Sequence, residues 1–203
     1  LYPYVNNAPG EGVVWSGFSG IDESPEGAEA TSIYADNMKF VIMRSAEDYK
    51  GTIKAYMYPP EWEACDGSAA PAGTVGLSIG QQTRKTFGLA FRTRVGNDQE
   101  FEDHGYKLHL VYGATASPSE RSYETINDSP DAMELSWEFE TIPVNVAGYK
   151  PFAHMEIDST KLKTEAEKKC LENLEKILYG SEAAKARLPL PAEVITIMTP
   201  AGG

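Results

Sequence analysis

Met133-Glu-Leu-Ser-Trp-Glu-Phe-Glu140 is the stretch of sequence that most strongly indicates the fold. Apolar and polar residues alternate over its whole length, which is typical of a β-strand with one buried face. We expect the apolar face to lie at the centre of the core, where each buried side chain contributes about 1.5–3 kcal/mol. That face consists of Met133, Leu135, Trp137 and Phe139.

The opposite face of the same strand carries Glu134, Glu138 and Glu140. Like charges about 7 Å apart along a strand are tolerated where the face meets water. The wider segment 97–140 holds eleven acidic and two basic residues, a local net charge of −9. Such a segment is typical of a solvated face, and it is also compatible with an acidic surface that has a function.

Length and composition predict one domain, residues 1–203. The formal charge of −12 argues against binding to DNA phosphates, which needs clustered Lys and Arg. Cys65 and Cys170 lie far apart in sequence, so we expect free thiols and a reducing compartment. The apolar runs are far shorter than the ~18 residues of a membrane span, and residues 1–7 do not resemble a signal peptide.

Strands and turns dominate the first half of the chain. Residues 1–32 are rich in Pro, Gly, Asn and Ser and are predicted to form an extended N-terminal arm. Residues 38–44 and 52–58 are predicted to pair as a hairpin. Residues 59–82, which begin with two prolines, are predicted to form a long loop, and loops of this length are commonly functional or interacting.

The second half contains further strands and one helix. Residues 86–95 and 106–112 alternate in polarity and are predicted to pair as a long antiparallel hairpin. Residues 152–157 and 194–199 are predicted strands. Residues 160–179 have an amphipathic helical pattern, with Thr164 and Glu167 as a capping box. The sequence therefore predicts a mainly β (α+β) fold with one C-terminal helix.

The polar residues suggest few candidate sites for metal binding or catalysis. His154, Glu156 and Asp158 alternate along one predicted strand and could face the same way, as a metal site requires, but any polar strand face gives this spacing. No HExxH, phosphate-binding loop or nucleophile elbow is present, and the glutamates of 134–140 form an open row rather than a glycosidase pair. We expect no catalytic residues, no cofactor and no metal, and hence no enzyme.

Aromatic residues near the loop at 59–82 are candidates for binding. Tyr56, Tyr58 and Trp62 flank the two prolines, and Trp15 is an isolated aromatic residue in the predicted arm. Tyr and Trp are common in protein interfaces and in sugar-binding platforms. We treat all four as candidate contacts between subunits.

A series of short motifs along nearly the whole chain resembles the major tail protein, or tail tube protein, of long non-contractile-tailed bacteriophages. The motifs are Ser24-Pro-Glu-Gly-Ala28, Ala35-Asp-Asn37, Tyr58-Pro59 with Glu61-Trp62, Cys65-Asp-Gly67, Gly96-Asn-Asp98, Tyr112-Gly-Ala-Thr-Ala116, Pro118-Ser-Glu120, Thr125-Ile-Asn-Asp-Ser129, Trp137-Glu-Phe139, Thr141-Ile-Pro-Val144, Ile157-Asp-Ser159 and Ile177-Leu-Tyr-Gly180. Their succession is more specific than any one of them.

The resemblance implies an antiparallel β-sandwich or half-barrel with a flanking helix, whose long hairpins join a tube-forming barrel. It implies a structural virion protein of the phage tail, made in the bacterial host cytoplasm, that assembles into stacked hexameric rings. Its partners would be further copies of itself, the tape measure protein inside the tube, the tail terminator and the distal tail proteins. DNA would pass through without specific binding, and no membrane would be involved.

Two other functions are compatible with the residues. One is a monomeric carbohydrate-binding β-sandwich that uses Tyr56, Tyr58 and Trp62. The other is a different ring-forming tail protein, such as a terminator or baseplate protein. In a tube, Glu134, Glu138 and Glu140 are candidates for the lumen, where carboxylates would repel the phosphates of DNA, although the outer wall is equally compatible with them.

Overall fold

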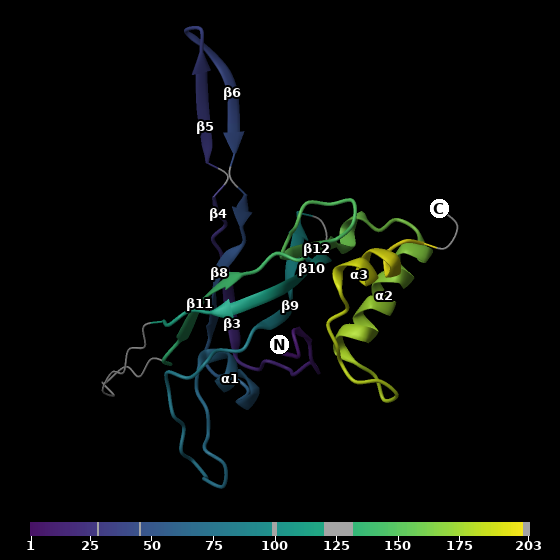
Figure 1. Ribbon diagram of the computed structural model, residues 1–203. Coiled ribbons are helices and arrows are strands. Elements are labelled where there is room, and N and C mark those ends of the chain that lie inside the picture. The colour runs from purple at the N-terminus through teal and green to yellow at the C-terminus, as the bar shows by residue number, and fades with distance from the viewer. Residues whose placement is uncertain (28, 45, 99–100, 120–131, 201–203) are drawn as a thin grey trace.

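The chain adopts a mainly β fold in this computed structural model, with 43% of residues in strands and 18% in helices. The structure describes residues 1–27, 29–44, 46–98, 101–119 and 132–200. A large sheet has helices at one side, and a long hairpin extends away from it (Figure 1). The predicted fold class, a mainly β antiparallel structure with a C-terminal helix, is confirmed, and the architecture is compatible with a β-sandwich or half-barrel.

The main sheet has the strand order β2-β1-β9-β10-β11-β8-β3, and β12 also pairs with β10. Every strand pair in it is antiparallel. Its strands are β1 (Tyr2–Val5), β2 (Ala8–Pro9), β3 (Phe18–Glu23), β8 (Lys50–Ala55), β9 (Phe87–Asn97), β10 (Phe101–Ala116), β11 (Leu135–Thr141) and β12 (His154–Asp158). The predicted antiparallel pairing of the segments 86–95 and 106–112 is confirmed as β9 and β10.

Strand β10 has two partners along one edge, and the sheet divides there. Residues 107–111 pair with β12, whereas residues 114–116 pair with β11. Gly113 lies between the two sets with φ of 62°, and a Cβ at this position would lie 2.6 Å from the carbonyl oxygen of Ile142. Only glycine suits both this backbone conformation and this close approach. The bend at Gly113 lets one strand serve both branches of the sheet.

The sheet curls so that β3, at one end of the strand order, approaches β9. Phe18 on β3 contacts Phe91 on β9, with ring centroids 6.4 Å apart, although these strands are not neighbours in the sheet. The space between them is filled by large side chains from β8, β9 and β11 and from the segment that follows β8. Trp62 and Trp137 are the largest of these, and their rings lie 5.4 Å apart.

Strand β11 has the predicted central position and alternation. It lies between β10 and β8, and Trp137 and Phe139 are buried whereas Glu138 and Glu140 are exposed. Met133, predicted to share the buried face, is exposed and precedes the strand. Pairing with β8 begins only at Leu135, opposite Ala55, the last residue of β8.

Two helices, α2 (Glu165–Tyr179) and α3 (Pro191–Ile197), cover the other face of β10. Leu171, Leu174 and Leu178 of α2 form one buried cluster with Leu108, Leu110 and Tyr112 of β10. The helix predicted at 160–179 begins only at residue 165, because residues 159–161 form a separate 3-10 turn. The capping box of Thr164 and Glu167 is present as predicted.

The predicted N-terminal arm is instead built of short strands. Residues 1–32 contain β1, β2, β3, β4 (Glu26–Gly27) and the start of β5 (Ala30–Ala35). Asn6 and Asn7 adopt positive φ in the turn between β1 and β2. The turn-forming residues that suggested an irregular arm therefore separate short strands. Two of these strands, β1 and β3, also pair with strands far away in sequence.

The predicted hairpin of residues 38–44 and 52–58 is wrong. Strand β6 (Met38–Arg44) pairs with β5, and β8 lies between β11 and β3. Asp36 and Asn37 form the two-residue turn between β5 and β6, with φ of 51° and 60°. Positive φ at both turn positions suits the right-handed twist of paired strands. Strand β6 therefore pairs with β5, the strand just before it in sequence, and not with β8. A second short pair, β4 with β7 (Glu47–Asp48), joins this hairpin to the main sheet.

Two further predictions need correction. Residues 194–199 were predicted as a strand, but α3 occupies most of them because Pro191 suits the first turn of a helix and Val194 packs into the core. The predicted long loop at 59–82 begins with a 3-10 turn (Pro60–Trp62) and α1 (Glu63–Asp66), which are anchored by buried Trp62 and Cys65. Cys65 and Cys170 are both free thiols.

Candidate functional site

The hairpin of β5 and β6 carries many exposed large apolar side chains. In Figure 1 it projects beyond the main sheet, and within the described residues it forms a two-stranded sheet of its own. All seven residues of β6 are exposed. We define the hairpin surface as its exposed large apolar side chains, namely Ile33, Tyr34, Met38, Phe40, Val41, Ile42 and Met43.

Both faces of this hairpin are apolar. Val41 and Met43 lie on one face of β6, and Ile42 lies between them on the other. The register with β5 shifts at Phe40, so the alternation is interrupted there. Phe40 is 76% exposed and Val41 is 40% exposed. Consecutive apolar residues are typical of strands covered on both faces, and an isolated two-stranded hairpin is at best marginally stable in water. The hairpin surface therefore has the composition of a buried strand pair but lies in solvent.

A second exposed apolar segment follows α1. Residues 67–86 contain no named helix or strand, although Ala69 and Ile79 form an isolated bridge. Val75 is fully exposed, and Leu77 and Ile79 are also exposed. In Figure 1 this loop extends from the end of the main sheet opposite to the hairpin. The molecule thus presents apolar side chains at two opposite ends.

The acidic row on β11 is exposed as predicted but is partly paired. Glu140 lies 3.2 Å from the ammonium of Lys50, its register partner on β8. The carboxylate of Glu134 accepts a hydrogen bond of 2.6 Å from the Ser19 hydroxyl. Lys54, also on β8, pairs with Asp22 of β3 at 2.7 Å. This face is therefore a mixed-charge surface with an excess of carboxylates.

Part of the acidic segment 97–140, namely residues 99–100 and 120–131, lies outside the described residues.

The aromatic candidates fall into two groups. Trp62 is fully buried among core aromatic rings, so its assignment as an interface residue is wrong. Trp15 packs beside it at a ring distance of 4.6 Å, and its indole N–H donates to the carbonyl of Met57 at 2.8 Å. Tyr56 and Tyr58 are exposed and remain available for contacts. The spacing around the two prolines could not reveal that Trp62 turns inward.

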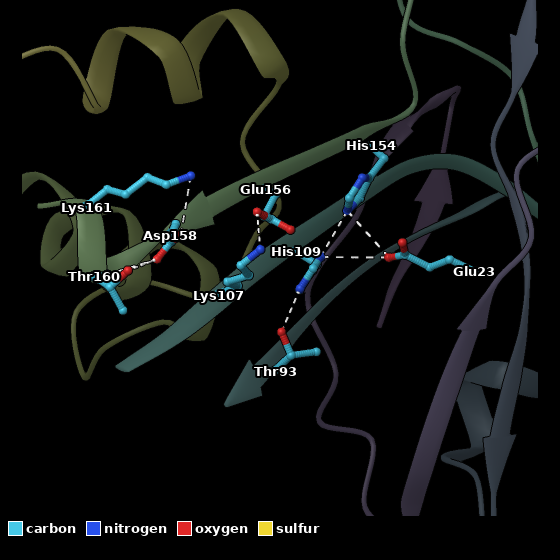
Figure 2. A network of polar contacts seen from close by, with 9 residues as sticks. All are labelled: Glu23, Thr93, Lys107, His109, His154, Glu156, Asp158, Thr160 and Lys161. Carbon is cyan, nitrogen blue, oxygen red and sulfur yellow. Dashed lines mark hydrogen bonds and ion pairs between the residues drawn. The ribbon is translucent and has the colours of Figure 1, made fainter. Parts of the chain in front are cut away.

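Three strands bring together a compact polar cluster that sequence spacing did not predict. It contains Glu23 at the end of β3, His109 on β10 and His154 on β12, whose potential ligand atoms lie within 4.8 Å of one another (Figure 2). His109 Nδ1 lies 3.1 Å from His154 Nε2. The Glu23 carboxylate oxygen Oε1 lies 3.8 Å from the former nitrogen and 3.9 Å from the latter.

Neighbouring side chains fix the orientation of both imidazoles. His109 Nε2 is hydrogen-bonded to the Thr93 hydroxyl at 2.9 Å, and the His109 ring stacks on Phe91. The ring of Tyr49 stacks on His154 at 4.6 Å, and its hydroxyl donates to Glu23 Oε1 at 2.9 Å. The cluster is therefore held by contacts from several elements.

The burial of His109 and His154 lowers the pKa of both imidazoles below the usual value of histidine, and the Glu23 carboxylate opposes this shift. Both rings are accordingly neutral at neutral pH. Burial and the hydrogen bond to Glu23 raise the pKa of Tyr49, which keeps its hydroxyl a donor.

The row of His154, Glu156 and Asp158 shares one face of β12, but the three side chains have different partners. Glu156 lies 2.9 Å from the ammonium of Lys107, and this hydrogen bond lowers its pKa. The Asp158 carboxylate accepts from the backbone N–H of Thr160 at 3.0 Å and caps the 3-10 turn (Figure 2). Only His154 joins the polar cluster. His109 and Glu23, the other members, come from strands whose approach depends on the curl of the sheet.

Comparison with protein-family models and with curated protein sequences found no match. Within the described residues, no helix combines the length and the apolar character needed to cross a membrane.

Proposed function

We propose that this chain is a tail tube protein of a long non-contractile-tailed bacteriophage, which assembles into stacked hexameric rings around a channel for the genome. The sequence resemblance supplies the kind of assembly. The single observation that carries the proposal on structural grounds is the hairpin surface, which has an apolar composition on both faces and no cover among the described residues.

Burial of the hairpin surface between copies of the chain would provide the driving force for assembly. Each large apolar side chain removed from water contributes about 1.5–3 kcal/mol, and several such side chains lie on each hairpin. The edges of β5 and β6 also leave backbone groups that can pair with a neighbouring strand. A second copy of the chain would satisfy both needs at once.

The position of the two exposed apolar segments favours a head-to-tail contact. The hairpin and the loop at 67–86 lie at opposite ends of the molecule, so one copy can offer its hairpin to a different surface of the next (Figure 1). Heterologous contacts of this kind generate closed rings or open stacks rather than isolated dimers. This arrangement supports an assembly that grows along one axis.

The acidic row is the candidate for the lumen of the tube. Glu134, Glu138 and Glu140 are exposed, and carboxylates would keep DNA from adhering to the channel wall. We propose no catalytic role for the chain. Its partners would be its own copies, the tape measure protein, the terminator and distal tail proteins, and its final location the virion.

One of the three aromatic residues proposed for a carbohydrate-binding module is not accessible to a ligand. Trp62 is buried, so only Tyr56 and Tyr58 remain exposed from the proposed aromatic platform. A single-ring tail protein, such as a terminator, remains an alternative because it would use the same kind of exposed surface. The two assemblies differ in whether rings stack.

Electron microscopy of the purified chain at high concentration, with and without native tail extract as seed, tests the proposal. We expect tubes or stacked rings for the wild type and for Phe40→Leu, which keeps an apolar side chain, and none for Phe40→Asp. A wild-type chain that stays monomeric in both conditions would overturn the proposal. Single rings that never stack would favour the terminator alternative.

The lumen assignment has its own test, which is the simultaneous replacement of Glu134, Glu138 and Glu140 by Lys. Tails that assemble but eject DNA poorly are the expected outcome, because Lys would form ion pairs with phosphates. Replacement by Gln serves as the control, since it adds no positive charge opposite Lys50, the register partner of Glu140. Unimpaired ejection through normal tails with all three Lys would reject the assignment.

A further inference from the structure

We propose that Glu23, His109 and His154 bind one divalent first-row transition metal ion such as zinc. The ligands would be His109 Nδ1, His154 Nε2 and a carboxylate oxygen of Glu23. Two imidazoles and one carboxylate are a common ligand set for such ions. This site differs from the row of His154, Glu156 and Asp158. The two share His154, but the three side chains of the row do not point to a common centre.

The spacing of the three ligand atoms fits a metal site. Zinc lies about 2.0–2.1 Å from imidazole nitrogens, so two ligands of a tetrahedral site are about 3.4 Å apart. The two nitrogens are 3.1 Å apart, and the carboxylate oxygen lies 3.8 and 3.9 Å from them. Shifts of a few tenths of an ångström bring all three to the required spacing. Glu23 can make this adjustment because its side chain is about 39% exposed.

The surrounding hydrogen bonds are those that a metal site needs. A metal on His109 Nδ1 requires the proton on Nε2, and Nε2 lies 2.9 Å from the Thr93 hydroxyl, which can accept it. The Tyr49 hydroxyl donates to the Glu23 carboxylate. Outer contacts of this kind orient metal ligands and contribute to affinity. The stacking of Phe91 and Tyr49 on the two imidazoles limits their rotation further.

The local charge favours a cation. Glu23 is an acceptor-only group beside two imidazoles, and the nearby carboxylate of Glu156 is balanced by Lys107. The cluster thus has one carboxylate in excess. His109 is buried, whereas Glu23 and His154 are partly exposed, so an ion can enter from the solvent side and keep a water molecule as a further ligand.

A bound ion would link β3 to two strands with which it does not pair. Glu23 ends β3 at one end of the strand order, whereas His109 and His154 lie on β10 and β12. The ion would therefore fasten the curled sheet where β3 approaches β10 and β12. Because β4, in the short strand pair that leads to the hairpin, begins three residues after Glu23, the site would also anchor the hairpin's base.

The test is a titration of the full-length chain, stripped with chelator, with Co²⁺ followed by absorption and with Zn²⁺ followed by calorimetry. The chain has three histidines, so His104→Gln is a matched control that removes an imidazole outside the cluster. We expect one ion per chain for the wild type and for His104→Gln, with visible Co²⁺ bands of nitrogen and oxygen ligation. His154→Gln and Glu23→Gln should each weaken binding at least tenfold.

Thermal unfolding provides the second readout. Zn²⁺ should raise the melting temperature of the wild type and of His104→Gln, but not that of His154→Gln. Circular dichroism without metal establishes that each variant is folded. The proposal is overturned if the folded wild type binds no ion at micromolar concentration. It is equally overturned if His154→Gln binds as tightly as the wild type, in which case the cluster is only a hydrogen-bonded polar contact.

Discussion

Strands β11 and β6 are equally long, but the three large apolar residues of β11 and the five of β6 lie in opposite environments. In β11 apolar and charged residues alternate, and the core covers the apolar face. In β6 the apolar residues are consecutive, and both faces are exposed. The apolar face of β11 is therefore covered within its own chain, whereas the apolar residues of β6 are left uncovered by the described residues.

The largest effect is expected in β11. Trp137→Ala should lower the free energy of unfolding by about 3–5 kcal/mol, because the ring is buried between Trp62 and the rest of the core and its removal leaves a cavity. Trp137→Phe should cost clearly less. It retains most of the volume and removes an indole N–H that has no hydrogen-bond partner among the described residues. Urea denaturation measures both, and equal losses would contradict this packing.

Patterns of residues close in sequence correctly predicted those elements whose structure depends mainly on neighbouring residues. The alternation around Trp137, the pairing of β9 with β10 and the capping box at Thr164 depend on residues close in sequence. The turn of Asp36 and Asn37 is also a local signal, and it outweighs the polar residues after β6 on which the wrong hairpin prediction depended. The strand assignment of residues 194–199 failed because packing of the helix outweighed the propensity of β-branched residues.

The polar cluster could not be predicted in the same way. Glu23 and His109 are brought together by the curl of the sheet, which depends on pairings between strands far apart in sequence. Spacing along β12 pointed to Glu156 and Asp158 as companions of His154, because residues two apart share a strand face. It could not show that Lys107 and Thr160 engage these carboxylates instead.

The turn of the hairpin should show a smaller and local effect. Asn37→Val places a β-branched side chain at φ of 60°, which costs about 1–2 kcal/mol. We expect faster hydrogen exchange of the amides of β5 and β6, with no change in the exchange of β11, because the two regions share no strand pairing. Asn37→Gly should leave the exchange of the hairpin unchanged or slower. Faster exchange throughout the main sheet would show that the hairpin supports the body of the protein.

The ion pair between Arg187 and Glu193, in the C-terminal region, is expected to make a smaller and pH-dependent contribution to stability. Hydrogen bonds from Arg187 lower the pKa of Glu193 below its usual value of 4.5. The unfolded state therefore binds the proton more readily, so the ion pair stabilises the fold above pH 4.5 and loses its effect as the pH falls through the lowered pKa. Because the side chains of Arg187 and Glu193 are 50% and 39% exposed, solvent screens the pair and Glu193→Gln should cost no more than about 1 kcal/mol at pH 7. A loss that is as large at pH 3 as at pH 7 would contradict this origin.

The smallest effect on stability is expected for a substitution in β6. This substitution tests most directly whether the hairpin is covered within its own chain. Phe40 is largely exposed, so Phe40→Ala should change the free energy of unfolding of the dilute monomer by less than about 0.5 kcal/mol. The same substitution should reduce assembly, because the side chain would be buried only between copies. Denaturation at low concentration and microscopy at high concentration separate the two effects. If Phe40→Ala destabilises the monomer as Trp137→Ala does, the hairpin is covered within its own chain, and the argument for a second copy fails.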